Sequence, residues 1–253
     1  MRYMNFNDLR NQQNACIQQT YGGMPGISEH VGIGVSALLA FLYETGKLAD
    51  LKTEPGVVQS YAWLWVNKSV YTIVASLTCA ESGFYAESLS LNRSLSEALV
   101  QILYLIKHPA AVAQLPNTAN GRKRKLSFRK MFEEVAPGYY DTAYFLSSEF
   151  IHPGLEGNVY KLQRGKDGQG QIDQGIVFKS DPLTHCFNEL SMLILGLLRS
   201  FRLVYPTLAL KPDTLAQCEL AMESLQKVID SHIELKGGKN DWHRLSEHLW
   251  NPS

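Results

Sequence analysis

Two adjacent helical segments of this chain are apolar on nearly every side. Apolar residues recur near helical spacing through residues 57–80 and again through 82–107. A helix at the surface of a globular protein shows one polar face, whereas apolar residues surround much of 57–106. We therefore expect this helical hairpin to lie at the centre of the fold, covered by other helices.

Helical patterns also dominate the rest of the chain. Asp181 followed by Pro182 predicts a helix start, because Asp is a good cap and Pro fits the first helical position. Ser28 can cap an earlier helix, and Pro109 either ends the hairpin or begins a short extra turn. The helices expected outside the hairpin cover residues 5–20, 28–45, 126–135, 139–151, 182–205, 213–235 and 240–249.

Residues 157–178 depart from the helical pattern. The β-prone stretches VYKLQ and GIVFK flank RGKDGQGQIDQ, which is rich in turn residues. We expect a small β-hairpin-like excursion here from an otherwise helical fold.

The predicted architecture is a single all-α domain that spans residues 1–253. It has N-terminal helices in 1–55, a helical bundle core in 57–205 that includes the β-like excursion, and C-terminal helices in 211–250. About four long helices are expected to form the core, with peripheral short helices around them. These four helices cover residues 57–80, 82–107, 182–205 and 213–235.

Composition excludes a globally charged nucleic-acid or membrane binder. Lys and Arg together number 24, as do Asp and Glu, so no net field draws the chain to a polyanion and any anion site must be local. The longest nearly apolar runs, 31–43 and 190–198, are shorter than the ~20 residues that span a bilayer. The four cysteines are far apart, which is typical of free thiols in a reducing compartment. We expect a cytoplasmic protein without membrane contact.

No motif in the chain indicates a cofactor or a metal. The stretch GIGVSA at 32–37 has the shape of a dinucleotide-binding turn, but a predicted helix rather than a strand precedes it. Its glycines are better explained by close helix–helix contact. His185 and Glu189 lie four residues apart, yet two ligands do not make a metal site, and a helix-surface pair is the simpler interpretation.

One stretch of the chain is strongly basic. GRKRKLSFRK at 121–130 holds six basic residues in ten, among them Arg122, Lys123, Arg124 and Lys125. Such a cluster can bind phosphate or RNA, because phosphate contacts supply much of the affinity for nucleic acid. It can equally be a solvated loop, since only Phe128 supplies an aromatic for base stacking. Both interpretations stay open.

A charge pair interrupts the second helix of the hairpin. Arg93 and Glu97 lie four residues apart and share one side of the helix with mostly apolar neighbours, namely Ala86, Leu89, Val100 and Tyr104. The opposite side is also apolar, so both sides require cover. A buried ion pair costs several kcal/mol of desolvation per ion unless other polar groups satisfy it. If the pair is buried, Glu97→Ala should lower the stability by ~3–5 kcal/mol, because it leaves a buried arginine without its partner. If the pair is buried, further polar side chains must converge on it.

The stretch YFLSSEFIHPG at 144–154 can supply such groups. Tyr144, Ser148 and His152 recur every four residues and would share one face of the short helix at 139–151. A histidine at a helix C-terminus is well placed to titrate near neutral pH and to act as an acid or base. The sequence alone does not show that this face meets Arg93.

Residues 57–205 resemble a bacterial family described as a domain of unknown function. The likeness rests on NRSLSEALVQILYLIKHP, the basic stretch after it and YFLSSEFIHPG. That family is similar to the HEPN helical superfamily, which includes RNA-cleaving toxins and phage-defence proteins. The resemblance implies that Arg93, Glu97, Ser148 and His152 are the characteristic polar residues, and HEPN-like proteins are often homodimers. HEPN ribonucleases share an arginine followed, after four to six residues, by histidine, and this chain has no such spacing.

Two functional hypotheses follow, and the sequence does not decide whether the protein is an enzyme. In the first it is a metal-independent ribonuclease in which His152 is the acid or base, Arg93 binds phosphate and Glu97 orients one of them. Arg122–Lys125 would then steer RNA. In the second, the same polar residues form a buried structural network in a non-catalytic protein that binds a partner or small ligand. No cofactor is expected in either.

Overall fold

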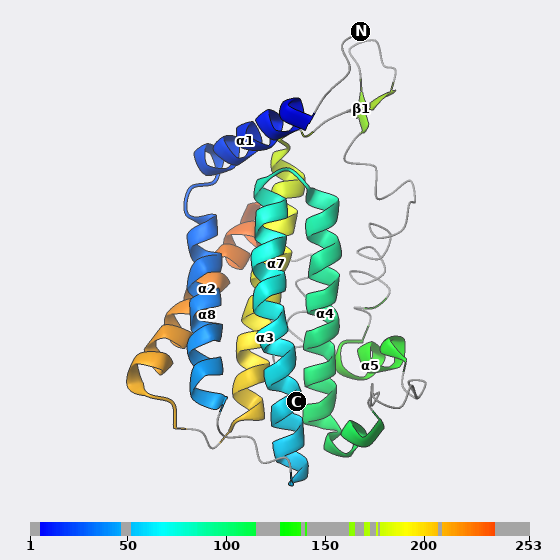
Figure 1. The fold of residues 1–253 in the computed structure, drawn as a ribbon, viewed down its shortest axis with the longest axis vertical. Helices are drawn as coiled ribbons and strands as arrows, with labels where there is room; N and C mark the ends of the chain where they lie inside the picture. Colours follow the sequence, from blue (N-terminus) through cyan, green and yellow to red (C-terminus); the bar gives the residue numbers. More distant parts are fainter. Residues whose placement is uncertain are drawn as a thin grey trace.

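The computed structural model describes residues 6–46, 52–114, 127–137, 140, 162–164, 170–172, 176, 178–206 and 209–235. Over these residues the chain is all-helical apart from two strands of three residues each (Figure 1). The elements are α1 Phe6–Gly23, α2 Ile27–Thr45, α3 Glu54–Glu81, α4 Tyr85–Lys107, the 3-10 helix η1 Pro109–Gln114, α5 Phe128–Val135, β1 Leu162–Arg164, β2 Gly170–Ile172, α7 Ser180–Val204 and α8 Pro212–Leu235.

Local sequence signals set most of these boundaries. The hydroxyl of Thr53 accepts a hydrogen bond from the Gly56 amide at 3.2 Å and so caps α3. At the turn between α3 and α4, Gly83 has a φ of 82°, a conformation that strongly favours glycine. Two expected caps are wrong: α2 begins at Ile27 and α7 at Ser180, one residue before the predicted caps Ser28 and Asp181. The Ser28 hydroxyl instead donates to the Glu81 carboxylate, a tertiary contact.

The long helices α2, α3, α4, α7 and α8 pack side by side around one apolar core (Figure 1). The helices α4 and α7 run parallel. At their starts, the backbone amide of Lys179 donates to the Tyr85 hydroxyl, and seven residues further along both helices the Asn92 side chain donates to the Cys186 carbonyl oxygen. The helices α3 and α8 run the opposite way (Figure 1). The expected long helices are thus present, and α2 contributes Phe41 to the same core.

The centre of the bundle is α7 rather than the hairpin of α3 and α4. Nearly every residue of α7 from Leu183 to Phe201 is buried. The helix α4 is covered on both sides, as expected, but α3 exposes Leu64, Tyr71 and Val74. The expectation that the whole hairpin is enclosed is therefore wrong for one face of α3, because apolar composition alone does not show which face a neighbour covers.

A close approach between α2 and α7 explains one glycine of GIGVSA. A Cβ atom at Gly34 would lie 2.7 Å from the Cγ2 atom of Ile194, whereas one at Gly32 would meet nothing within 4 Å. Close helix packing is therefore confirmed for Gly34 but not for Gly32, which faces solvent. The motif lies inside α2. It is therefore not the turn between a strand and a helix that a dinucleotide phosphate site requires.

The expected β-like excursion at 157–178 is described only in part. Strands β1 and β2 pair antiparallel, with Leu162 opposite Ile172 and Arg164 opposite Gly170. Most of the excursion and the helices expected at 139–151 and 240–249 lie outside the described residues, so the hairpin as a whole stays a prediction.

Two further expectations concern the thiols and the membrane. Each of the four cysteines is a free thiol, and Cys79 is the only one of them that is not buried. Within the described residues, no single helix has both the length and the apolar character to cross a bilayer. The bent pair of α1 and α2, with 91° between its helices, meets that test by length and composition alone.

Candidate functional site

The Arg93–Glu97 pair lies on α4 at the edge of the core. The Nε atom of Arg93 is 3.4 Å from Oε1 of Glu97, and the two side chains are 22% and 27% exposed. Their neighbours on the same stripe, Leu89, Val100 and Tyr104, are buried. The pair is therefore mostly buried but partly accessible to solvent, between an exposed and a fully buried ion pair.

A fully buried polar network begins one residue before Arg93. The Asn92 side chain accepts a hydrogen bond from the Ser76 hydroxyl at 2.7 Å and donates one to the Glu189 carboxylate at 3.0 Å. The Ser88 hydroxyl lies 2.9 Å from that of Ser76 and extends the chain. These residues join α3, α4 and α7 at one level of the bundle, so the network fixes how the helices meet.

Glu189 is the residue whose environment differs most from expectation. It is 2% exposed, so the interpretation of His185 and Glu189 as a helix-surface pair is wrong for the glutamate. A carboxylate is costly to bury unless donors satisfy it, and Asn92 supplies one of them. Among the described residues no group of three or more His, Cys, Asp or Glu side chains is arranged to hold a metal ion.

The Cys186 thiol beside this network is fully buried. Complete burial raises the pKa of the Cys186 thiol far above its usual range, and the nearby Glu189 carboxylate adds to that rise. A thiol must ionise to attack a substrate or bind a metal, so Cys186 acts here as a packing residue. The Cys186 thiol lies 3.7 Å from the Tyr85 carbonyl oxygen, inside the small cluster that joins α4 to α7.

The remaining predicted site residues lie outside the described part of the chain. They are Tyr144, Ser148, His152 and the basic residues Arg122, Lys123, Arg124 and Lys125. The structure therefore brings Arg93 and Glu97 together, and the approach of His152 to them stays a prediction.

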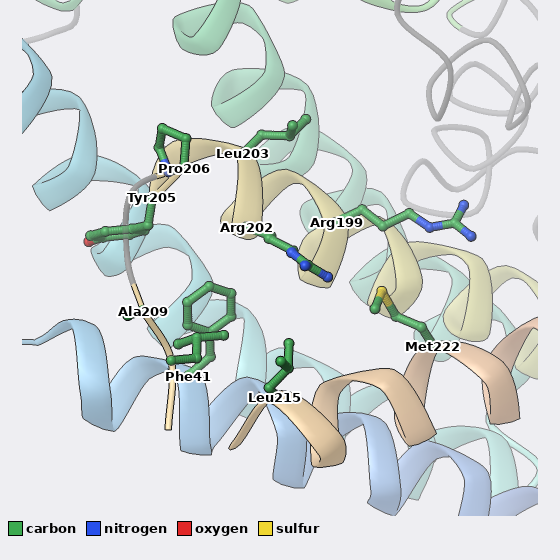
Figure 2. Close-up of a pocket in the computed structure, with 10 residues that line it drawn as sticks. Phe41, Arg199, Arg202, Leu203, Tyr205, Pro206, Ala209, Leu215 and Met222 are labelled. Carbon is green, nitrogen blue, oxygen red and sulfur yellow. The ribbon is translucent and has the colours of Figure 1, made fainter. Parts of the chain in front are cut away.

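A cavity at the far end of α7 was not expected from the sequence. Its volume is about 600 Å³, and it opens where α7 ends and α8 begins, against α2 (Figure 2). Apolar side chains line most of it, together with Arg199 and Arg202. The signal that could have found it is a pair of arginines one turn apart in the apolar stretch LLRSFRLVYP. Such spacing places both on one helical side.

Comparison with known proteins adds no relative. No protein-family model, curated protein or solved structure matches this chain. The likeness to HEPN-like helical proteins therefore rests on the residues of the sequence alone.

Proposed function

We propose that the α4 face that carries Arg93 and Glu97 binds a phosphate-bearing RNA and, together with His152, cleaves it without a metal ion. The observation that carries this proposal is the partial exposure of Arg93, which is 22% accessible although its stripe neighbours are buried. The Glu97 carboxylate holds this guanidinium in place while part of it stays accessible to solvent. Such a guanidinium binds a phosphate oxygen better than a fully solvated guanidinium does.

The proposed reaction is an intramolecular transesterification. His152 would take the proton of an RNA 2′-hydroxyl, whose oxygen attacks the adjacent phosphorus and displaces the 5′-oxygen of the next nucleotide. The same proton would then pass to that leaving oxygen. Arg93 would stabilise the charge on the phosphorane, and Glu97 would orient Arg93. Ser148 and Tyr144 would supply further hydrogen bonds, and Arg122–Lys125 would attract the RNA backbone.

A second function is favoured by the network beside the pair. Because Asn92 and Glu189 are fully buried and hydrogen-bonded, polar residues of α4 already serve the packing of the bundle. If Arg93 and Glu97 belong to the same structural system, the protein is a non-catalytic helical binder of a partner or small ligand. Four long helices would form the scaffold in either case, with the β-like excursion beside them.

RNA cleavage by the purified protein separates the two functions. We expect wild type to cleave single-stranded RNA in the presence of EDTA, and His152→Ala and Arg93→Ala to lose at least about 100-fold in rate while retaining their helical circular dichroism. Arg10→Ala is the matched control, because Arg10 is an exposed arginine of α1 that lies outside both the Arg93–Glu97 face and the basic stretch at 121–130. Absence of cleavage, or equal cleavage by wild type and His152→Ala, would favour the binding protein.

Homodimerisation is part of the same proposal. The apolar residues Leu64, Tyr71 and Val74 that α3 leaves exposed support it, because a monomer gains nothing from leaving them in water. Light scattering tests it against the chain mass of 28.4 kDa. A monomeric mass at all concentrations would exclude the dimer without bearing on cleavage.

A further inference from the structure

Two aromatic rings, Phe41 and Tyr205, line the cavity between α2, α7 and α8. The buried Phe201 ring packs against both, with ring centroids 4.8 Å from Phe41 and 5.2 Å from Tyr205, which it meets edge-on. The Tyr205 hydroxyl donates to the Gln59 carbonyl oxygen of α3 at 3.2 Å, which fixes the ring. All three rings are buried, so this end of the cavity exists before any ligand arrives.

The rim is open to water. Leu203 and Pro206 are exposed, and Arg202 is exposed beside them. A cavity of about 600 Å³ with a closed apolar floor and an accessible mouth lies within the usual size range of small-molecule sites, ~300–1,000 Å³.

Arg202 places a positive charge over this apolar space. Figure 2 shows its guanidinium directed into the group of lining side chains, between Leu215 and Met222. The guanidinium of Arg202 makes no hydrogen bond or ion pair with any residue that the structure describes. None of the described lining residues is acidic.

The acidic side chain of Glu44 on α2 is already engaged. The Glu44 carboxylate accepts a hydrogen bond from the Thr214 hydroxyl and another from the Lys211 amide at 3.0 Å. The Thr214 bond is the largest reason why the pKa of Glu44 lies below its usual range. Glu44 therefore stabilises the start of α8 and leaves the charge of Arg202 for a ligand.

Arg199 adds a second cation one turn earlier on α7. Its guanidinium extends past Met222 toward the edge of the site (Figure 2), and its Nη2 atom lies 3.5 Å from Oε1 of Gln226. Arg199 is half-buried, and this burial lowers the pKa of its guanidinium. An anion near Arg202 would interact favourably with Arg199 as well.

We propose that this cavity binds an amphipathic anion, whose carboxylate or phosphate head group contacts Arg202 and whose apolar chain lies against Phe41 and Tyr205. A cationic ligand would be repelled by both arginines. A neutral apolar ligand would cover Arg202 without pairing it, and an unpaired charge is costly to desolvate. This site is separate from the Arg93–Glu97 face and does not depend on RNA cleavage.

Four probes that share one twelve-carbon chain test the charge requirement. They are laurate, dodecyl phosphate, dodecanol and dodecyltrimethylammonium, each titrated below its micelle concentration into the full chain by calorimetry. We expect saturable binding of one molecule of laurate, dodecyl phosphate or both, and the tighter of the two identifies the head group. Saturable binding of the cation or the alcohol with equal affinity, or of no probe, would overturn the proposal.

Three variants locate the binding. Arg202→Ala should weaken the anionic probes about 10- to 100-fold, since a hydrogen bond to a charged group is worth about 1.5–3 kcal/mol. Met222→Trp should block the cavity and abolish binding with the charge intact. Arg10→Ala removes an exposed arginine of α1 and should bind as wild type. Because Arg202 is exposed, its variant should fold even if Met222→Trp does not. Unchanged affinity in Arg202→Ala would overturn the proposal.

Discussion

The side-chain amide of Asn92 on α4 donates a hydrogen bond to the carboxylate of Glu189 on α7 at 3.0 Å, and both residues are fully buried. Asn92 in turn accepts from Ser76 on α3, so one short chain of hydrogen bonds ties three helices together. The pairing therefore selects one alignment of α3, α4 and α7, because any other would leave a carboxylate buried without its donor.

The first prediction concerns this pair. Asn92→Ala should lower the free energy of unfolding by about 3 kcal/mol, because it leaves the Glu189 carboxylate short of a donor in the core. Urea denaturation of Asn92→Ala, Glu189→Ala and the double variant measures the coupling. We expect the free energy of unfolding to fall less in the double variant than the two single losses add up to, by at least about 1 kcal/mol. Strictly additive losses would show that the two residues do not act together.

The second prediction concerns the charge pair on the same helix. Glu97→Ala should cost about 1–2 kcal/mol, between the values for exposed and for buried ion pairs, because Glu97 is about three-quarters buried. The matched control is Glu133→Ala, which breaks another pair of the same spacing whose side chains are 60% and 57% exposed. We expect the control to cost under about 0.5 kcal/mol in the same urea experiment. Equal losses in the two variants would mean that burial adds nothing to the Arg93–Glu97 pair.

The third prediction uses two glycines of one helix. Gly34→Ala should destabilise the protein by about 1–3 kcal/mol, because the new methyl group overlaps Ile194 across the contact of α2 with α7. Gly32→Ala should instead stabilise it by about 0.5–1 kcal/mol, since alanine is the better helix former and nothing lies within 4 Å. Thermal melts of the two variants give the comparison. A loss in both, or a gain in both, would contradict the difference in free space around the two positions.

The fourth prediction concerns alkaline pH. Burial raises the pKa of Tyr85 and of Tyr205 to about 12, against about 10 in an unfolded chain. Below pH ~10 both states keep these protons, so neither residue makes stability depend on pH. Between pH ~10 and ~12 only the unfolded state releases them, so the free energy of unfolding falls by about 1.4 kcal/mol per pH unit for each tyrosine.

Single substitutions isolate these contributions. Tyr85→Phe and Tyr205→Phe should each make the alkaline decline shallower in urea titrations, while Tyr43→Phe, which changes an exposed tyrosine, should not. The comparison must be with wild type, because the buried thiol of Cys186 also has a raised pKa and contributes to the decline. Slopes that match wild type in both buried variants would show that these phenols ionise as readily in the folded protein.

Local sequence patterns were enough to predict the long helices. The long helices expected at 57–80, 82–107, 182–205 and 213–235 are observed as α3, α4, α7 and α8, with ends that differ by at most three residues. This part is predictable because the helical spacing of apolar residues depends only on neighbours in the chain. The exact starts were less predictable: Thr53 caps α3, which begins three residues before the expected start, and Gly83 turns the chain into α4.

Which face of each helix is covered depends on packing between segments that are distant in the sequence. Glu189 is buried because α4 presents Asn92 to it, and Leu64 is exposed because no described helix covers that face of α3. The cavity beneath Arg202 likewise needs α2 and α8 to complete its walls. Helical periodicity shows that two sides of a helix differ in polarity. The segments that pack against each side, however, are distant in the sequence. Local patterns carry no information about that choice.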